Sequence, residues 1–122
     1  MNEILSQEKS IYIQISEMIE NDILRDVLLE DERVPSTNEL AKLYAINPAT
    51  AAKGVNILVD AGILYKKRGI GMFVSNGAKE TIRSKRKAQF YENYVSVIIN
   101  EAKTLGITKD ELIEGIEKNF EK

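Results

Sequence analysis

The sequence has 122 residues, of which 43% are hydrophobic and 30% charged, and its formal net charge is −2. This length is enough for one compact domain, or for a small domain with a helical appendage, and it excludes two large domains. Cysteine and histidine are both absent, which excludes a disulfide framework, the common zinc sites and the Ser-His and Cys-His nucleophile pairs. We therefore predict no catalytic residue, no metal site and no cofactor.

Neither a membrane span nor an export signal is predicted. The longest apolar stretch is too short to cross a bilayer. The first ten residues, MNEILSQEKS, lack the basic region and the apolar run of a secretory signal. We expect a cytoplasmic protein with no membrane partner.

The charge is distributed unevenly along the chain. Residues 1–61 carry 5 basic and 11 acidic side chains, residues 62–87 carry 8 and 1, and residues 88–122 carry 4 and 7. The small net charge therefore hides a strongly basic middle segment. A solvated charged surface is the ordinary interpretation of such a segment, so its position in the fold decides whether it binds nucleic acid.

A first amphipathic helix is predicted near the N-terminus. Apolar residues recur there at spacings of three and four, which is the period of a helix with one buried face. They are Ile11, Ile15, Met18, Ile19 and Ile23.

Two short helices follow, separated by a tight turn. Ser36 and Glu39 form a Ser-x-x-Glu capping box, which predicts a helix that starts at Ser36. Asn47 is a strong N-cap and Pro48 suits the first helical position, so the third helix begins there. We expect it to end at residue 60 or 61, because Gly62 suits a left-handed C-cap.

A β-hairpin is predicted after the third helix. From Ile63 two short apolar segments flank the basic sequence KKRGIG, residues 66–71, which places the glycines at the tip.

Two helices are predicted in the C-terminal part. The first runs from about Glu80 to Thr104 and is closed by Gly106. The second has a capping box of its own, Thr108 with Glu111.

This order of elements is that of a winged helix-turn-helix, in which the helix after the turn enters the DNA major groove and the hairpin lies beside it. The predicted fold is mainly helical with a small β-hairpin. We expect a winged helix-turn-helix DNA-binding domain over residues 1–77 and a two-helix dimerisation region over residues 78–122.

The third helix is the candidate recognition helix. Its inward face is predicted to hold Ala51, Val55, Leu58 and Gly62. Its outward face holds Ala49, Lys53, Asn56 and Asp60. Small residues at the start allow the backbone to approach a phosphate. Thr50 could contact a phosphate or a thymine methyl, Asn47 and Asn56 an adenine, and Lys53 a guanine or a phosphate.

Each of these residues also has a structural interpretation. Ser36 and Asn47 are needed as caps in any case, and a single lysine such as Lys53 is usually only solvated. Gly54 indicates a close crossing of two helices. Lysines in the hairpin discourage aggregation at an exposed strand edge. The combination of a tight helix-turn-helix with a basic, glycine-tipped hairpin nevertheless favours DNA binding.

Residues 34–74 carry a set of motifs that resembles the DNA-binding domain of the GntR superfamily of bacterial transcription regulators. The shared motifs are Val34-Pro35-Ser36, Glu39-Leu40-Ala41, Thr50, Leu58 ahead of Ala61-Gly62-Ile63-Leu64, and Arg68-Gly69-x-Gly71-x-Phe73-Val74. Ile-Tyr-x-Gln-Ile at residues 11–15 extends the similarity to the first helix. The Asn47-Pro48 pair and the short tail are similar to the YtrA-like branch, whose members are homodimeric regulators often encoded with ABC transporters.

The resemblance implies contacts with double-stranded DNA at Ser36, Asn38, Asn47, Ala49, Thr50, Lys53, Arg68 and Gly69. Asn56 and Lys67 are added as candidates from their positions on the outward helix face and in the basic hairpin. The sequence departs from the family where many members have arginines, at Asn38 and at Pro48 or Ala49. Two family glycines are replaced by Asp26 and Asp31, and aspartate tolerates turn conformations.

The predicted long helix carries two apolar stripes. One stripe contains Tyr91, Val95, Ile98, Ala102 and Leu105, and the other contains Phe90, Tyr94 and Val97. We expect one stripe to cover the final helix and the other to meet a second subunit. A thick intramolecular core is the alternative. Phe90, Tyr91, Tyr94 and Phe120 could line a small pocket, but aromatic residues at helical spacing are more often core, so no particular effector is predicted.

The leading hypothesis is a sequence-specific, homodimeric repressor that binds a palindromic operator near its own gene. The YtrA-like resemblance adds control of an ABC-transporter operon. The alternative is a winged-helix module that binds protein without specific DNA binding, which the acidic balance and the missing arginines favour. Arg83, Lys85, Arg86 and Lys87, after the hairpin, could contact flanking phosphates or only increase solubility.

Overall fold

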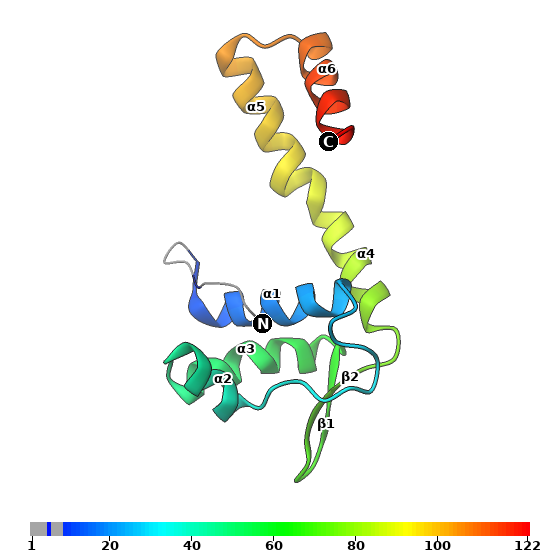
Figure 1. The fold of residues 1–122 in the computed structure, drawn as a ribbon. Coiled ribbons are helices and arrows are strands. Elements are labelled where there is room, and N and C mark those ends of the chain that lie inside the picture. The colour runs from blue at the N-terminus through cyan, green and yellow to red at the C-terminus, as the bar shows by residue number, and fades with distance from the viewer. Residues whose placement is uncertain (1–4, 6–8) are drawn as a thin grey trace. The chain divides into compact units, whose positions relative to one another are not determined.

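The structure is a computed structural model that describes residue 5 and residues 9–122 (Figure 1). It forms two compact units, one ending at Ser84 and the other spanning Lys85–Lys122. The chain is mainly helical and contains one two-stranded antiparallel sheet in its described part, as predicted. None of the described helices is long and apolar enough to cross a membrane.

Three helices form the body of the first unit. They are α1 (Ile11–Leu24), α2 (Thr37–Tyr44) and α3 (Pro48–Asp60). Both predicted helix starts are confirmed. Ser36 and Glu39 form the complete capping box of α2, and the side chain of Asn47 accepts a hydrogen bond from the N–H of Ala49 at the start of α3.

The core of the first unit lies between α1, α3 and the hairpin. Three of the four residues predicted on the inward face of α3, Ala51, Val55 and Leu58, are fully buried there. The prediction for Gly62 was wrong, because this residue lies beyond the helix end and is exposed. Its φ of +75° instead supports its predicted role in ending the helix.

The crossing of α1 and α3 is close, as Gly54 predicted. A Cβ atom at position 54 would lie 2.5 Å from the carbonyl oxygen of Tyr12 and 3.0 Å from the Cβ of Ile15. Only glycine allows the two helices to approach this far.

The predicted hairpin consists of β1 (Leu64–Lys67) and β2 (Gly71–Val74). The segment before α2 adds to the free side of β2. The N–H groups of Asp31 and Val34 donate to the carbonyl groups of Val74 and Met72, and the N–H of Val74 donates to Glu32. The wing, residues 64–74, is therefore paired on both sides of β2 near its base.

Asp26 and Asp31 both adopt left-handed conformations, with φ of +61° and +64°. Their side chains are also used. The carboxylate of Asp26 pairs with Lys79 at 3.0 Å, and that of Asp31 accepts a 2.7 Å hydrogen bond from the hydroxyl of Tyr65.

The predicted long helix is not one continuous α-helix. It starts earlier than predicted, as α4 (Ala78–Phe90), passes through one π-helical turn, η1 (Tyr91–Val95), and continues as α5 (Ser96–Leu105). The two stripes were drawn at regular α-helical spacing, and this spacing fails across the wider turn. Gly106 ends α5 in a left-handed conformation, as predicted.

The final helix, α6 (Lys109–Phe120), begins at the predicted capping box of Thr108 and Glu111. It runs back beside α5 within the second unit (Figure 1). Ala102 is the one described hydrophobic residue of this unit that is buried.

Candidate nucleic-acid interface

The outward face of α3 is exposed and has few long side chains. Ala49, Lys53, Asn56 and Asp60 are all exposed, as predicted. The start of the helix has Pro48 and Ala49 in place of long side chains, with Thr50 half-buried beside them. The unpaired N–H groups and the positive end of the helix dipole can therefore come close to a phosphate.

Lys53 has a partner that the sequence did not show. Its ammonium nitrogen lies 4.0 Å from the ring centre of Tyr12 on α1, in a cation–π contact. Because Gly54 brings α1 against α3 next to this lysine, the contact is a consequence of the close helix crossing. The lysine remains exposed but is held over the Tyr12 ring, near the middle of α3.

Two of the predicted contacts already serve as caps. The hydroxyl of Ser36 accepts a hydrogen bond from the N–H of Glu39, and Asn47 caps α3. Hydrogen bonds with Ser36 hold the pKa of the Glu39 carboxyl below its usual value, and Arg33 lowers this pKa further. Asn38, in the first turn of α2, is exposed.

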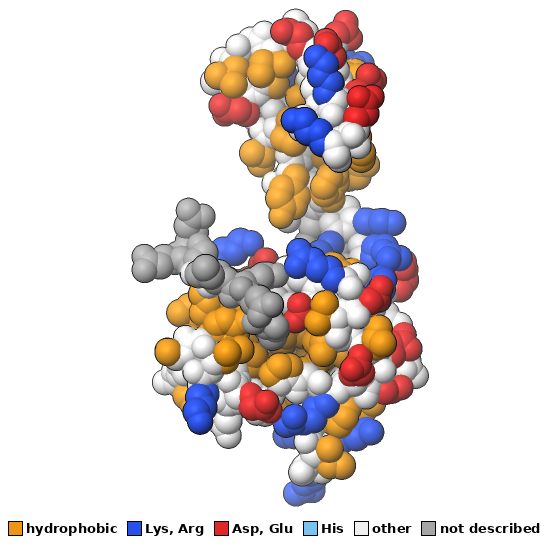
Figure 2. All heavy atoms as spheres, in the orientation of Figure 1, with side chains coloured by type: hydrophobic (Ala, Val, Ile, Leu, Met, Phe, Trp, Pro, Cys, Tyr) orange, Lys and Arg blue, Asp and Glu red, His pale blue; other side chains and the backbone are white. Residues whose placement is uncertain are grey.

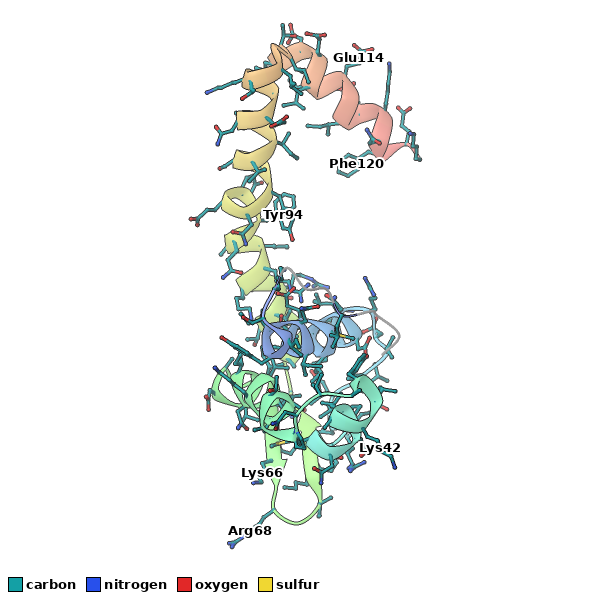
Figure 3. All side chains as sticks on the ribbon, turned by 90° about the vertical axis from the view of Figure 1, so that its left-hand side faces the viewer. Lys42, Lys66, Arg68, Tyr94, Glu114 and Phe120 are labelled. Carbon is teal, nitrogen blue, oxygen red and sulfur yellow. The ribbon has the colours of Figure 1, made fainter. Side chains whose placement is uncertain are left out.

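The wing presents its positive charge at the tip. Arg68 projects from the end of the hairpin (Figure 3), and the space-filling view shows further Lys and Arg side chains above this tip (Figure 2). Lys67 folds back instead, with its ammonium 4.5 Å from the ring centre of Phe73. Gly69 forms the turn with a φ of +77°.

Seven of the ten predicted DNA contacts thus fall into two groups. Ser36, Asn47, Lys53 and Lys67 are each engaged within the protein. The side chains of Asn38, Asn56 and Arg68 make no hydrogen bond or ion pair within the described part of the chain. All of these residues lie in the first unit, on α2, α3 and the wing.

Sequence reasoning did not single out two further exposed cations, Lys42 on α2 and Lys66 on β1 (Figure 3). Neither has an ion-pair partner among the residues that the structure describes. Lys42 lies outside the basic middle segment of the sequence but in the same unit as the wing. No group of three or more metal-binding side chains occurs in residue 5 and residues 9–122.

The residues predicted for dimerisation are largely exposed in the single chain. Tyr91 is 69% exposed, Tyr94 60% and Leu105 63%, and Phe90 and Ile98 are about half exposed. Val95 is half-buried, and Ala102 is covered within the unit. Tyr94 on η1 and Phe120 on α6 project from the two helical arms of the second unit (Figure 3).

Comparison with known families identifies the first unit. The sequence profile of the gntR family of bacterial regulatory proteins matches residues 11–74. The HTH-type transcriptional regulator YhcF of Bacillus subtilis (strain 168) is 30% identical over 118 residues, which cover 95% of this chain and 94% of YhcF. The HTH-type transcriptional repressor YtrA of the same strain is 30% identical over 108 residues, covering 88% of this chain and 82% of YtrA.

Solved protein structures are also similar to this chain. A GntR-family transcriptional regulator from Bacteroides thetaiotaomicron superposes with a TM-score of 0.73 at 36% identity, covering 91% of this chain and 96% of that one. The DNA-binding domain of AraR in complex with operator ORX1 superposes with a TM-score of 0.53 at 32% identity, covering 62% of this chain and 92% of that one.

Proposed function

Because the chain belongs to the GntR family of bacterial regulatory proteins and is a DNA-binding transcriptional regulator, we propose that it is a homodimeric repressor of a palindromic operator. The operator lies near its own gene, and the regulated genes are those of an ABC-transporter operon. The protein acts in the cytoplasm.

One observation carries this proposal. The exposed polar face of α3 and the cationic tip of the wing, with Arg68, belong to one compact unit. A winged helix-turn-helix uses these two elements to contact the major groove and the adjacent backbone. Ser36, Asn38, Asn47, Ala49, Thr50, Lys53, Asn56, Lys67, Arg68 and Gly69 are the proposed DNA contacts.

The proposed readout relies little on arginine. Arg68 at the wing tip contacts the phosphate backbone, and its charge increases affinity for all sequences. Asn38 and Asn56 have side chains available for adenine, and Thr50 for a thymine methyl. Sequence-dependent DNA shape supplies further discrimination, because the small residues at the start of α3 bring the backbone close to the duplex.

The relatives support two parts of this proposal, the repression of transcription and the binding of operator DNA. YtrA of Bacillus subtilis is a repressor, and the AraR domain binds an operator. This chain spans most of YtrA, so repression by the whole protein is the function we assign to it.

The dimer is proposed to form through the second unit. Many of its apolar side chains are exposed in the single chain, and aromatic and branched residues of this kind are typical of subunit interfaces. Phe90, Tyr91, Tyr94, Val95, Ile98 and Leu105 form the proposed contact surface. A dimer carries two recognition helices, as a palindromic operator with two half-sites requires.

Fluorescence anisotropy tests the function directly. The duplex is the DNA upstream of the gene, and a random duplex of equal length serves as the control, both titrated across a range of salt. We expect tighter binding to the upstream duplex and a log–log salt slope clearly below zero. Arg68→Ala should weaken binding to both duplexes, whereas Asn56→Ala should reduce the preference between them.

A second function, a winged-helix module that binds protein, is favoured by the net charge of −2 and by the engagement of Lys53 and Lys67 within the protein. A salt slope near zero, or equal affinity for the two duplexes, would support this module and contradict the repressor.

A further inference from the structure

The side chain of Arg33 joins two parts of the proposed interface. Its Nε donates to the carbonyl oxygen of Ile70 in the wing turn at 3.4 Å, and its terminal Nη2 donates to Oε1 of Glu39 on α2 at 3.1 Å. The same carboxylate oxygen accepts the N–H of Ser36 at 3.1 Å. One guanidinium therefore connects the tip of the wing to the cap at the start of α2.

The wing needs support at its tip more than at its base. Main-chain hydrogen bonds from residues 31–34 to β2 reach only as far as Met72. Beyond the last strand pair, Lys67 with Gly71, the N–H of Ile70 donates to the carbonyl of Lys67 within the turn. In the described part of the chain, Arg33 supplies the hydrogen bond that the turn receives from outside the hairpin.

The backbone at Gly71 is shaped around this side chain. A Cβ atom at position 71 would lie 2.9 Å from Nε of Arg33, and the φ of +144° is one that side-chain-bearing residues rarely adopt. Glycine here allows the guanidinium to lie directly against the wing turn.

We propose that Arg33 is a positioning residue, which holds the wing tip in a fixed orientation relative to the start of α2. This inference rests on the proposed function, because a fixed wing matters when α2, α3 and Arg68 engage one duplex together. The hairpin tip then loses less conformational freedom on binding.

A direct contact between Arg33 and a phosphate is the competing explanation. The positioning role is favoured because two N–H groups of the guanidinium are engaged within the protein and its charge is paired with Glu39. The two explanations predict different results for a lysine at this position. A lysine keeps the charge but has one ammonium in place of the planar fork, so it cannot reproduce both contacts.

The first measurement follows the order of the wing without DNA. The {1H}-15N nuclear Overhauser effect is recorded for the amides of residues 68–71 in the full-length wild-type protein, Arg33→Gln and Arg33→Lys. We expect lower values in both variants, with unchanged values for the amides of α3. Glu39→Gln should lower them less, because glutamine preserves the capping box but pairs more weakly with Arg33.

The second measurement is anisotropy with a duplex that the wild-type protein enriches from a random-sequence pool. We expect about five- to tenfold weaker binding for Arg33→Gln, no rescue by Arg33→Lys, and a salt slope equal to that of the wild type. Thermal melting of each variant checks that the first unit stays folded.

Unchanged order at residues 68–71 in Arg33→Gln and Arg33→Lys would overturn the proposal. So would full rescue of affinity by Arg33→Lys or a salt slope reduced by about one in Arg33→Gln, since each indicates a phosphate contact. A wild-type protein that enriches no duplex contradicts the proposed function, and the relaxation data then decide the role of Arg33 independently.

Discussion

The two units bury their apolar residues to very different extents. In the first unit, α1, α3, the hairpin and the start of α4 enclose residues such as Ile15, Leu58 and Ile82, which have no exposed surface. In the second unit, α5 and α6 leave Ile98, Ile116 and Phe120 from 45% to 86% exposed. The first unit has a complete core of its own, whereas the second has apolar surface that a partner would cover.

This difference separates the two tasks of the proposed regulator. A DNA-binding surface needs polar groups held rigidly, and the complete core beneath α2, α3 and the wing provides this. An interface between subunits needs apolar surface that is left over after the chain has folded. The predictions below test whether the units differ in this way.

The largest effect is expected from a charge in the second unit. Ile98→Glu would bury a carboxylate in the proposed interface, which costs about 3–5 kcal/mol. We expect a monomer in sedimentation equilibrium at micromolar concentration, and loss of binding to the enriched duplex in anisotropy.

Asn100→Glu is the matched control, because it adds the same charge at an exposed polar position of the same helix. It should leave a dimer that binds DNA. If Ile98→Glu also remains a dimer, α5 does not form the interface.

The next prediction compares the same substitution, glycine to alanine, made separately in each unit. Gly54→Ala should lower the free energy of unfolding by about 1–3 kcal/mol, because the added methyl group meets the backbone of Tyr12 and the side chain of Ile15. Gly115→Ala on α6 places its methyl group in open space, and should raise stability by up to about 1 kcal/mol through helix propensity. Urea unfolding measures both, and destabilisation by Gly115→Ala would show that this face of α6 is already tightly covered.

The smallest effect concerns the turn between α2 and α3. Ala45 ends α2 with a φ of +52°, a conformation that disfavours a residue with a Cβ atom. Ala45→Gly should therefore raise the free energy of unfolding by about 1 kcal/mol, measured by thermal melting. A melting temperature that falls would mean that the gain of chain entropy in the unfolded state outweighs the relieved strain.

Sequence reasoning was most successful where the signal was local. The caps at Ser36, Asn47 and Thr108 fix helix starts through side-chain hydrogen bonds to neighbouring N–H groups, so three or four letters suffice to predict them. Gly54 likewise indicated the close helix crossing. The approach to Tyr12 confirmed it.

Interactions between distant segments could not be predicted in the same way. Arg33 contacts Ile70, 37 positions away, and Lys53 contacts Tyr12 on another helix, so neither partner is visible in a local pattern. The π-helical turn was not predicted, because the apolar spacing was interpreted with the period of an uninterrupted α-helix. The exposure of a candidate side chain, which decides whether DNA can reach it, likewise depends on contacts between distant segments.

The most direct test of the account is selection of duplexes from a random pool by the full-length protein, followed by sedimentation of the complex to count its chains. We predict an enriched palindrome whose half-sites are separated by about 34 Å, one helical turn, or by a multiple of it, bound by two chains. A single asymmetric site bound by one chain, or no enriched sequence, would contradict the division of tasks between the two units.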